Sequence, residues 1–184
     1  MIYFYERRHA YTILVALVSL ISVFAANGHE EAACNDQLQG ECENKNTNND
    51  NNGIRLISRD ELQQKTGEDD PEIWLSILGD VYDVTGGESF YGKGTSYGAF
   101  AGRDCSVCFV SGIFSPEEAK KNILDVEDTK LLGILNWVEF YSTHESYNFV
   151  GHFVDPRYYK EDGNPTKNLV DLKKKVMSLS SVKK

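Results

Sequence analysis

The fold of this protein is decided by the stretch ILGDVYDVTGGESFYGKGTSYGAFAGRD, which runs from Ile77 to Asp104. Two runs of β-forming residues, 73–78 and 81–84, flank Gly79-Asp80, and this arrangement predicts a β-hairpin that Gly86-Gly87 closes. Glycines then recur up to residue 102 and discourage a long regular helix in this part of the chain.

Helix signals lie on both sides of this stretch. Capping boxes of the Ser-x-x-Glu type predict short helices over residues 58–67 and 115–125. A third helix is expected from about Thr129, because an apolar stripe follows at positions i, i+3, i+4 and i+7. The stripe consists of Leu131, Ile134, Leu135 and Val138.

A last strand is predicted over residues 149–153. The tail carries a weak amphipathic helix with Leu169, Leu172 and Val176 on its apolar side. Short strands interleaved with short helices predict an α+β domain.

The N-terminus has the pattern of a secretory signal peptide. A basic segment precedes an apolar run over residues 11–26, which is shorter than the roughly 20 residues that span a bilayer. Val23 and Ala25 form a small-residue cleavage site, so residues 1–25 are predicted to be removed and the protein secreted. The alternative is an uncleaved membrane anchor.

Residues 26–53 are predicted to be a disordered, Asn-rich linker before a domain over 54–155 and a C-terminal extension over 156–184.

Composition excludes some function classes. The 184 residues carry a formal net charge of -9, which argues against nucleic acid as a partner, because phosphate binding requires a basic face. The sequence shows neither a nucleophile with a placed base nor a cluster of metal ligands, and we therefore expect a protein that is not an enzyme.

A family resemblance follows from these residues. The hairpin ILGDVYDVTGG resembles the signature of the cytochrome b5 fold, and the continuation to FAGRD resembles the membrane-associated progesterone receptor branch of that family. Within that branch, Tyr147, Val150-Gly151 and the stretch from Arg157 to Thr166 resemble the neuferricin subgroup. The resemblance covers about residues 54–170, and it implies a cytochrome b5-like heme-binding domain with short helices packed on a small sheet.

The resemblance also implies how heme is held. Tyr97 takes the position of an axial ligand to ferric heme iron, in place of the histidine of cytochrome b5 itself, and Tyr91 and Tyr147 take positions that support it. Receptor members of the family carry a lysine just before the Tyr147 position, where this chain has Ser146. His144 and His152 do not follow the hairpin, where a cytochrome b5 ligand lies, so neither is expected to bind the iron.

The neighbouring residues have structural interpretations. Phe90 and Phe100 are expected in the wall of the heme pocket or in the core, and Trp137 in the core. Arg103 and Asp104 are expected to pair with each other or to cap a helix.

Four cysteines leave several interpretations open. In a secreted protein, Cys105 and Cys108 are expected in a structural disulfide, with each other or with Cys34 and Cys42. Free buried thiols, a redox pair and a metal site are the alternatives.

Three functions remain as hypotheses. The first is a secreted, non-enzymatic heme-binding protein, which by resemblance promotes neuronal differentiation through an unidentified cell-surface receptor. The second is a membrane-anchored adaptor that binds heme or steroid, which requires the apolar segment to be retained. The third is a thiol oxidoreductase that uses Cys105 and Cys108.

Overall fold

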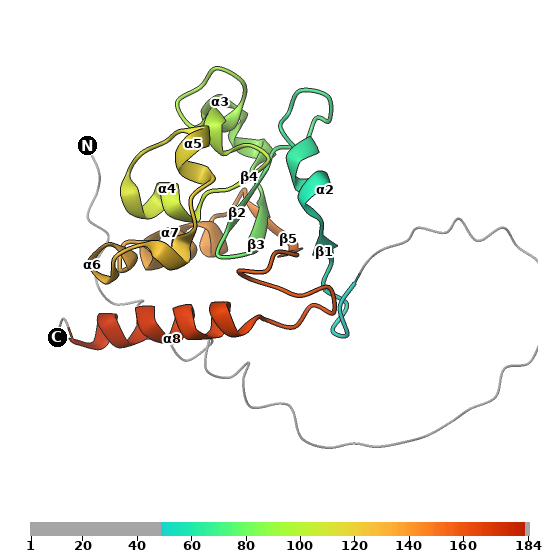
Figure 1. Ribbon diagram of the computed structural model, residues 1–184. Coiled ribbons are helices and arrows are strands. Elements are labelled where there is room, and N and C mark those ends of the chain that lie inside the picture. The colour runs from blue at the N-terminus through green and yellow to red at the C-terminus, as the bar shows by residue number, and fades with distance from the viewer. Residues whose placement is uncertain (1–48, 183–184) are drawn as a thin grey trace, which may run out of the picture. The chain divides into compact units, whose positions relative to one another are not determined.

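A computed structural model describes residues 49–182 of the chain. The predicted signal peptide, most of the predicted linker, Cys34 and Cys42 lie outside the described residues. The described chain contains a five-stranded sheet with the order β1-β5-β3-β2-β4 (Figure 1). Its strands are β1 Leu56–Ile57, β2 Trp74–Ile77, β3 Asp80–Asp83, β4 Arg103–Asp104 and β5 Asn148–Phe153.

The predicted hairpin is confirmed and forms the centre of this sheet. Strands β2 and β3 pair antiparallel, with Ile77 opposite Asp80. The two-residue turn consists of Leu78 and Gly79, one residue earlier than predicted, and both have left-handed backbone with φ of 50° and 85°. A tight hairpin turn of this kind needs positive φ at both central residues, so Asp80 is free to join the strand. The outer strands run parallel to their neighbours, β1 to β5 and β4 to β2.

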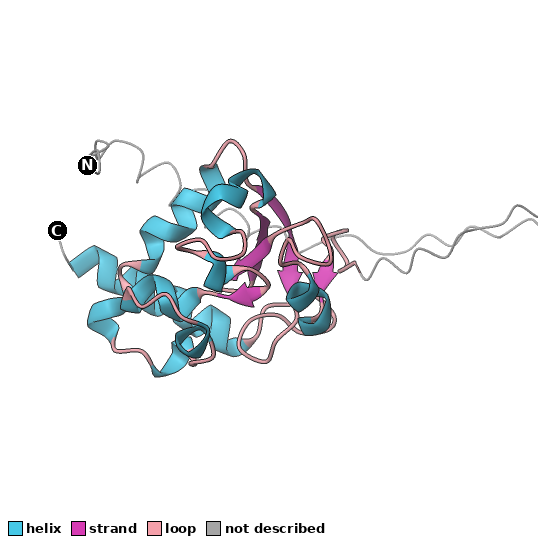
Figure 2. Cartoon of the chain, turned by 90° about the horizontal axis from the view of Figure 1, so that it is seen from above, coloured by secondary structure: helices cyan, strands magenta, loops and turns pink. Residues whose placement is uncertain are grey.

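Seven α-helices of the described residues surround the sheet, and those between β4 and β5 lie together on one side of it (Figures 1 and 2). The α-helices are α2 Arg59–Gln64, α3 Glu88–Tyr91, α4 Ser106–Ser111, α5 Pro116–Ala119, α6 Asp128–Leu131, α7 Ile134–Thr143 and α8 Lys167–Val182. Three 3-10 turns, η1 Thr85–Gly87, η2 Gly98–Phe100 and η3 Ile123–Asp125, complete the set.

The helix predictions are right about starts and wrong about lengths. Both capping serines are confirmed, since the Ser58 and Ser115 hydroxyls accept hydrogen bonds from the backbone amides of the third residue after each. The helix predicted over 115–125 breaks after Ala119, because the Asn122 side chain caps the separate turn η3. The helix predicted from Thr129 is interrupted at Gly133, which separates α6 from α7.

Residues after the last strand contribute to the core. The Tyr158 hydroxyl is fully buried and donates a hydrogen bond of 2.6 Å to Asp104 Oδ2. The predicted tail helix is confirmed as α8, which buries Leu169, Leu172 and Val176.

At the other end of the described residues, Asp50 Oδ1 accepts hydrogen bonds from the amides of residues 52 and 54, so the last residues of the predicted linker form a turn. No helix within residues 49–182 has the length and apolar character needed to cross a membrane.

Candidate functional site

A cavity of about 540 Å³ opens between the glycine-rich segment after the hairpin and helix α7. This volume lies within the range of small-molecule sites. The lining is almost entirely aromatic, and consists of Phe90, Tyr91, Tyr97, Phe100, Asn136, Trp137, Phe140, Tyr141, His144 and Tyr147. All three tyrosines predicted to act together at a heme therefore line one cavity.

Gly87 allows two of these tyrosines to approach the backbone. A Cβ atom at this position would lie 2.7 Å from the Tyr147 hydroxyl oxygen and 3.0 Å from two ring carbons of Tyr91. No side chain fits in this space without displacing one of the two rings. The glycine that follows the hairpin is therefore part of the construction of the cavity.

Tyr97 lies in the cavity wall with its ring fixed and its hydroxyl free. The ring stacks on Phe100 at a centroid distance of 5.6 Å and meets Phe114 edge-on at 5.3 Å. The Tyr97 amide donates a hydrogen bond of 3.0 Å to the carbonyl of Phe90, which fixes the backbone. Within residues 49–182, no group forms a hydrogen bond with the Tyr97 hydroxyl. This oxygen is available to a ligand.

Tyr91 lies deeper and is part of a buried hydroxyl pair. Its hydroxyl is 3.0 Å from that of Tyr141, and its ring centroid is 6.1 Å from that of Tyr97. Burial raises the pKa of Tyr91 well above its usual value, and the hydrogen bond with Tyr141 opposes this only in part. Tyr91 therefore stays protonated and can donate a hydrogen bond into the cavity.

Tyr147 forms the end wall together with His144. The two rings stack with centroids 3.7 Å apart and an interplanar angle of 9°. His144 Nδ1 accepts a hydrogen bond of 3.2 Å from the amide of Ser146. The other predicted non-ligand, His152, lies on β5 away from this cavity, with Nδ1 3.1 Å from Asp80 Oδ1.

Sequence reasoning missed part of the lining. Trp137, predicted to lie in the core, is only partly buried and faces the cavity together with Phe140, Tyr141 and His144. These four residues recur at i, i+3, i+4 and i+7, so they mark a second helical stripe. The sequence predicts that Trp137, Phe140 and Tyr141 broaden the apolar face of the stripe through Leu131, but it does not separate the residues that line the cavity from Leu131 and Ile134, which are buried in the core.

Cys105 and Cys108 are free, buried thiols, so the disulfide expected between them is absent, while a pairing with Cys34 or Cys42 lies outside the described residues. The Cys105 thiol donates to the carbonyls of Phe100 and Arg103, at 3.5 and 3.6 Å. Burial raises the pKa of Cys105 well above its usual value, and raises that of Cys108 to about 11. Neither cysteine has the low pKa of a reactive thiolate.

Arg103 and Asp104 do not pair with each other. Arg103 donates hydrogen bonds to the carbonyls of Ala99 and Ala101. Asp104 accepts hydrogen bonds from the backbone and side chain of Ser106 at the start of α4, and forms an ion pair with Arg157 at 3.0 Å. Asp104 lies one residue before Cys105, the N-cap residue of α4, and its carboxylate accepts from the first amide of that helix without being the capping side chain.

Residues 58–150 match the family described as "Cytochrome b5-like Heme/Steroid binding domain". The chain belongs to this family. The α+β class and the cytochrome b5-like fold predicted from the sequence are thereby confirmed.

Relatives within and beyond animals support this assignment. Neuferricin of Mus musculus is 40% identical over 121 residues, which are 65% of this chain and 45% of that protein. The neuferricin homolog of Drosophila pseudoobscura pseudoobscura is 39% identical over 70% of this chain and 43% of its own length. Membrane-associated progesterone-binding protein 4 of Arabidopsis thaliana is 43% identical over 62% of this chain and 46% of its own length. The chain thus matches less than half the length of each of these relatives.

The residues of this cytochrome b5-like domain fit a heme group. A planar apolar macrocycle needs flat aromatic walls, and Phe90, Trp137 and Phe140 provide them. An iron ligand needs a donor atom that the protein does not already use, and the Tyr97 hydroxyl has no hydrogen-bond partner within the described residues.

Proposed function

We propose that this protein is a non-enzymatic heme carrier in which Tyr97 binds ferric heme iron through its phenolate oxygen. The observation that carries the proposal is the free Tyr97 hydroxyl in an aromatic cavity of a heme/steroid-binding domain. A phenolate is a hard anionic ligand that suits ferric iron, and when bound the heme supplies the redox-active iron.

The other tyrosines hold the ligand in place. A phenolate on ferric iron is stabilised by a hydrogen-bond donor that lies close to it. Tyr91 stays protonated and its ring lies beside that of Tyr97, so it supplies a hydrogen-bond donor in this part of the cavity. Tyr147 contacts Tyr91 edge-on at 5.8 Å and closes the end of the cavity.

The test is hemin titration of wild type and of Tyr97→Phe, which keeps the ring and removes only the oxygen. We expect heme affinity to fall by about tenfold or more, which corresponds to about 1.4 kcal/mol, with loss of the high-spin ferric spectrum. The matched control is Tyr82→Phe, since Tyr82 is buried but does not line the cavity.

A histidine ligand would refute the assignment. His144 lines the cavity and His152 does not, so His144→Ala and His152→Ala form a second matched pair. The proposal is wrong if Tyr97→Phe keeps the wild-type spectrum while His144→Ala loses it.

We further propose that the protein acts outside the cell as a factor that promotes neuronal differentiation. The support is the signal-peptide pattern of residues 1–25 and the similarity to neuferricins. N-terminal sequencing of material from the culture medium is expected to begin at residue 26. Recovery of Met1 in a membrane fraction would instead favour an anchored heme or steroid adaptor, the reading that the name of the Arabidopsis relative supports.

The thiol oxidoreductase hypothesis has less support. Cys105 and Cys108 are buried, and their raised pKa values disfavour the thiolate that such chemistry requires.

A further inference from the structure

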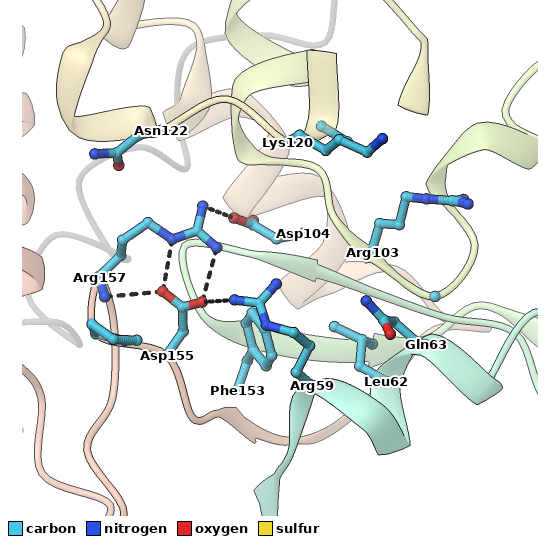
Figure 3. A pocket seen from close by; sticks show the side chains of 13 residues that line it. Arg59, Leu62, Gln63, Arg103, Asp104, Lys120, Asn122, Phe153, Asp155 and Arg157 are labelled. Carbon is cyan, nitrogen blue, oxygen red and sulfur yellow. Dashed lines mark hydrogen bonds and ion pairs between the residues drawn. The ribbon is translucent and has the colours of Figure 1, made fainter. Parts of the chain in front are cut away.

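A second cavity, of about 490 Å³, opens between helix α2, strand β4 and the segment that follows β5 (Figure 3). It shares no lining residue with the aromatic cavity. Its charged lining consists of Arg59, Arg103, Lys120, Arg157, Asp104 and Asp155. The lining therefore holds four cationic side chains and two carboxyl groups, a formal positive excess of two in a chain with a formal net charge of -9.

The two carboxylates hold Arg157 in a fixed orientation. Its Nε and one terminal nitrogen donate to the two oxygens of Asp155 at 2.7 and 3.0 Å, and its other terminal nitrogen lies 3.0 Å from Asp104 Oδ2. The side chains of Asp155 and Asp104 are only 2% and 5% exposed. Hydrogen bonds from Arg157 outweigh the effect of burial and hold the pKa of Asp155 below its usual range, so this carboxylate is charged at neutral pH.

The remaining cations are only partly neutralised. Arg59 donates to the same Asp155 oxygen that Arg157 already binds, so two guanidinium groups converge on one carboxylate. Arg103 makes hydrogen bonds only to carbonyls among the described residues, and Lys120 has no acidic partner there. Figure 3 shows the side chains of Arg59 and Arg157 reaching toward the cavity from below and from the left, with the Lys120 side chain above it.

We propose that this cavity binds a phosphomonoester group. Such a group carries close to two negative charges at neutral pH, which matches the local excess, and its oxygens suit the fork of arginine N–H donors. The cavity is much larger than a phosphate ion, and Leu62, Phe153 and Pro156 give it an apolar wall for an organic portion of the ligand. The Arg59 guanidinium lies 5.5 Å from the centroid of the Phe153 ring, where a cation–π contact positions it.

The test uses two matched pairs of variants with the full chain. Lys120→Gln removes a lining charge, and Lys121→Gln removes the charge of the next residue, which pairs with Glu118 outside the cavity. Arg59→Gln is matched by Arg55→Gln, since Arg55 pairs with Glu61 and does not line the cavity. The probes are phenyl phosphate in solution, phenyl sulfate as its singly charged analogue, and vesicles that contain phosphatidate.

We expect calorimetric binding of phenyl phosphate, with a dissociation constant that rises about fivefold or more in Lys120→Gln and Arg59→Gln and stays within about twofold in the controls. Phenyl sulfate should bind more weakly. Binding to phosphatidate vesicles alone, with the same loss in Lys120→Gln, identifies a lipid headgroup as the source of the phosphomonoester. The proposal is overturned if neither phosphate probe binds up to about 10 mM, or if each control loses as much affinity as its partner.

Discussion

Replacement of Gly87 by alanine tests how the aromatic cavity is built. The backbone of Gly87 has φ -104° and ψ 27°, which alanine adopts without left-handed strain. The added methyl group is therefore the whole perturbation. It would lie 2.7 Å from the Tyr147 hydroxyl oxygen and 3.0 Å from the Tyr91 ring, so at least one of the two rings has to move.

The expected size follows from the surroundings of these rings. Tyr147 is stacked on His144 and Tyr91 is hydrogen-bonded to Tyr141, so neither ring moves without loss of a contact. Overpacking of this kind costs about 1–3 kcal/mol. We expect the free energy of unfolding to fall by that amount, and heme affinity to fall about tenfold because both rings line the cavity.

Gly86→Ala is the matched control. A Cβ atom at Gly86 would come no closer than 3.4 Å to any atom, at a carbonyl oxygen of Ser146, which is ordinary contact. Alanine also restricts the unfolded chain, so this variant should be neutral or more stable by a few tenths of a kcal/mol. Urea unfolding of both variants measures the change in stability, and hemin titration measures the change in heme affinity. If Gly87→Ala behaves like Gly86→Ala in both assays, the two tyrosines are not held by this glycine.

Three further predictions concern other buried groups. Without reductant, Cys105 and Cys108 should be alkylated slowly in the folded protein and rapidly in urea, whereas a disulfide would block both reactions. Asp155→Asn should lower the free energy of unfolding by about 3–5 kcal/mol at pH 7. Since the folded pKa of Asp155 is lowered, this difference from wild type should shrink as the pH falls below about 4 in urea titrations. Tyr141→Phe should weaken heme binding less than Tyr97→Phe in hemin titrations, because it removes only the partner of Tyr91.

The elements predicted correctly from the sequence are those fixed by interactions between residues that are close together in the chain. The Ser58 and Ser115 caps act over three residues, and the hairpin turn needs only two residues with positive φ. Helix ends were harder to predict, because the end of α5 depends on Asn122, whose side chain favours a new turn over continuation of the helix.

Features that depend on contacts between residues far apart in the sequence could not be predicted. Tyr158 reaches back 54 positions to Asp104, and nothing in the sequence around either residue indicates this pair. The second, charged cavity could not be predicted for the same reason, since its cations come from α2, β4, the end of α5 and the segment after β5. The aromatic cavity was more accessible to prediction, since most of its tyrosines lie in one glycine-rich motif and on one helical stripe.

The motif from Phe100 to Asp104 connects the two cavities. Phe100 lines the aromatic cavity, and Arg103 and Asp104 line the charged one. The chain reverses between them at Gly102, which has a φ of 71° and whose amide donates a hydrogen bond of 2.7 Å to the carbonyl of Trp74. A Cβ atom at Gly102 would lie 3.1 Å from two carbonyl oxygens of α2, so both conformation and space require glycine. The Cys105 thiol then closes this turn through the carbonyls of Phe100 and Arg103. A short motif that appears in the sequence as one signature thus contributes residues to two separate cavities, with Gly102 between them.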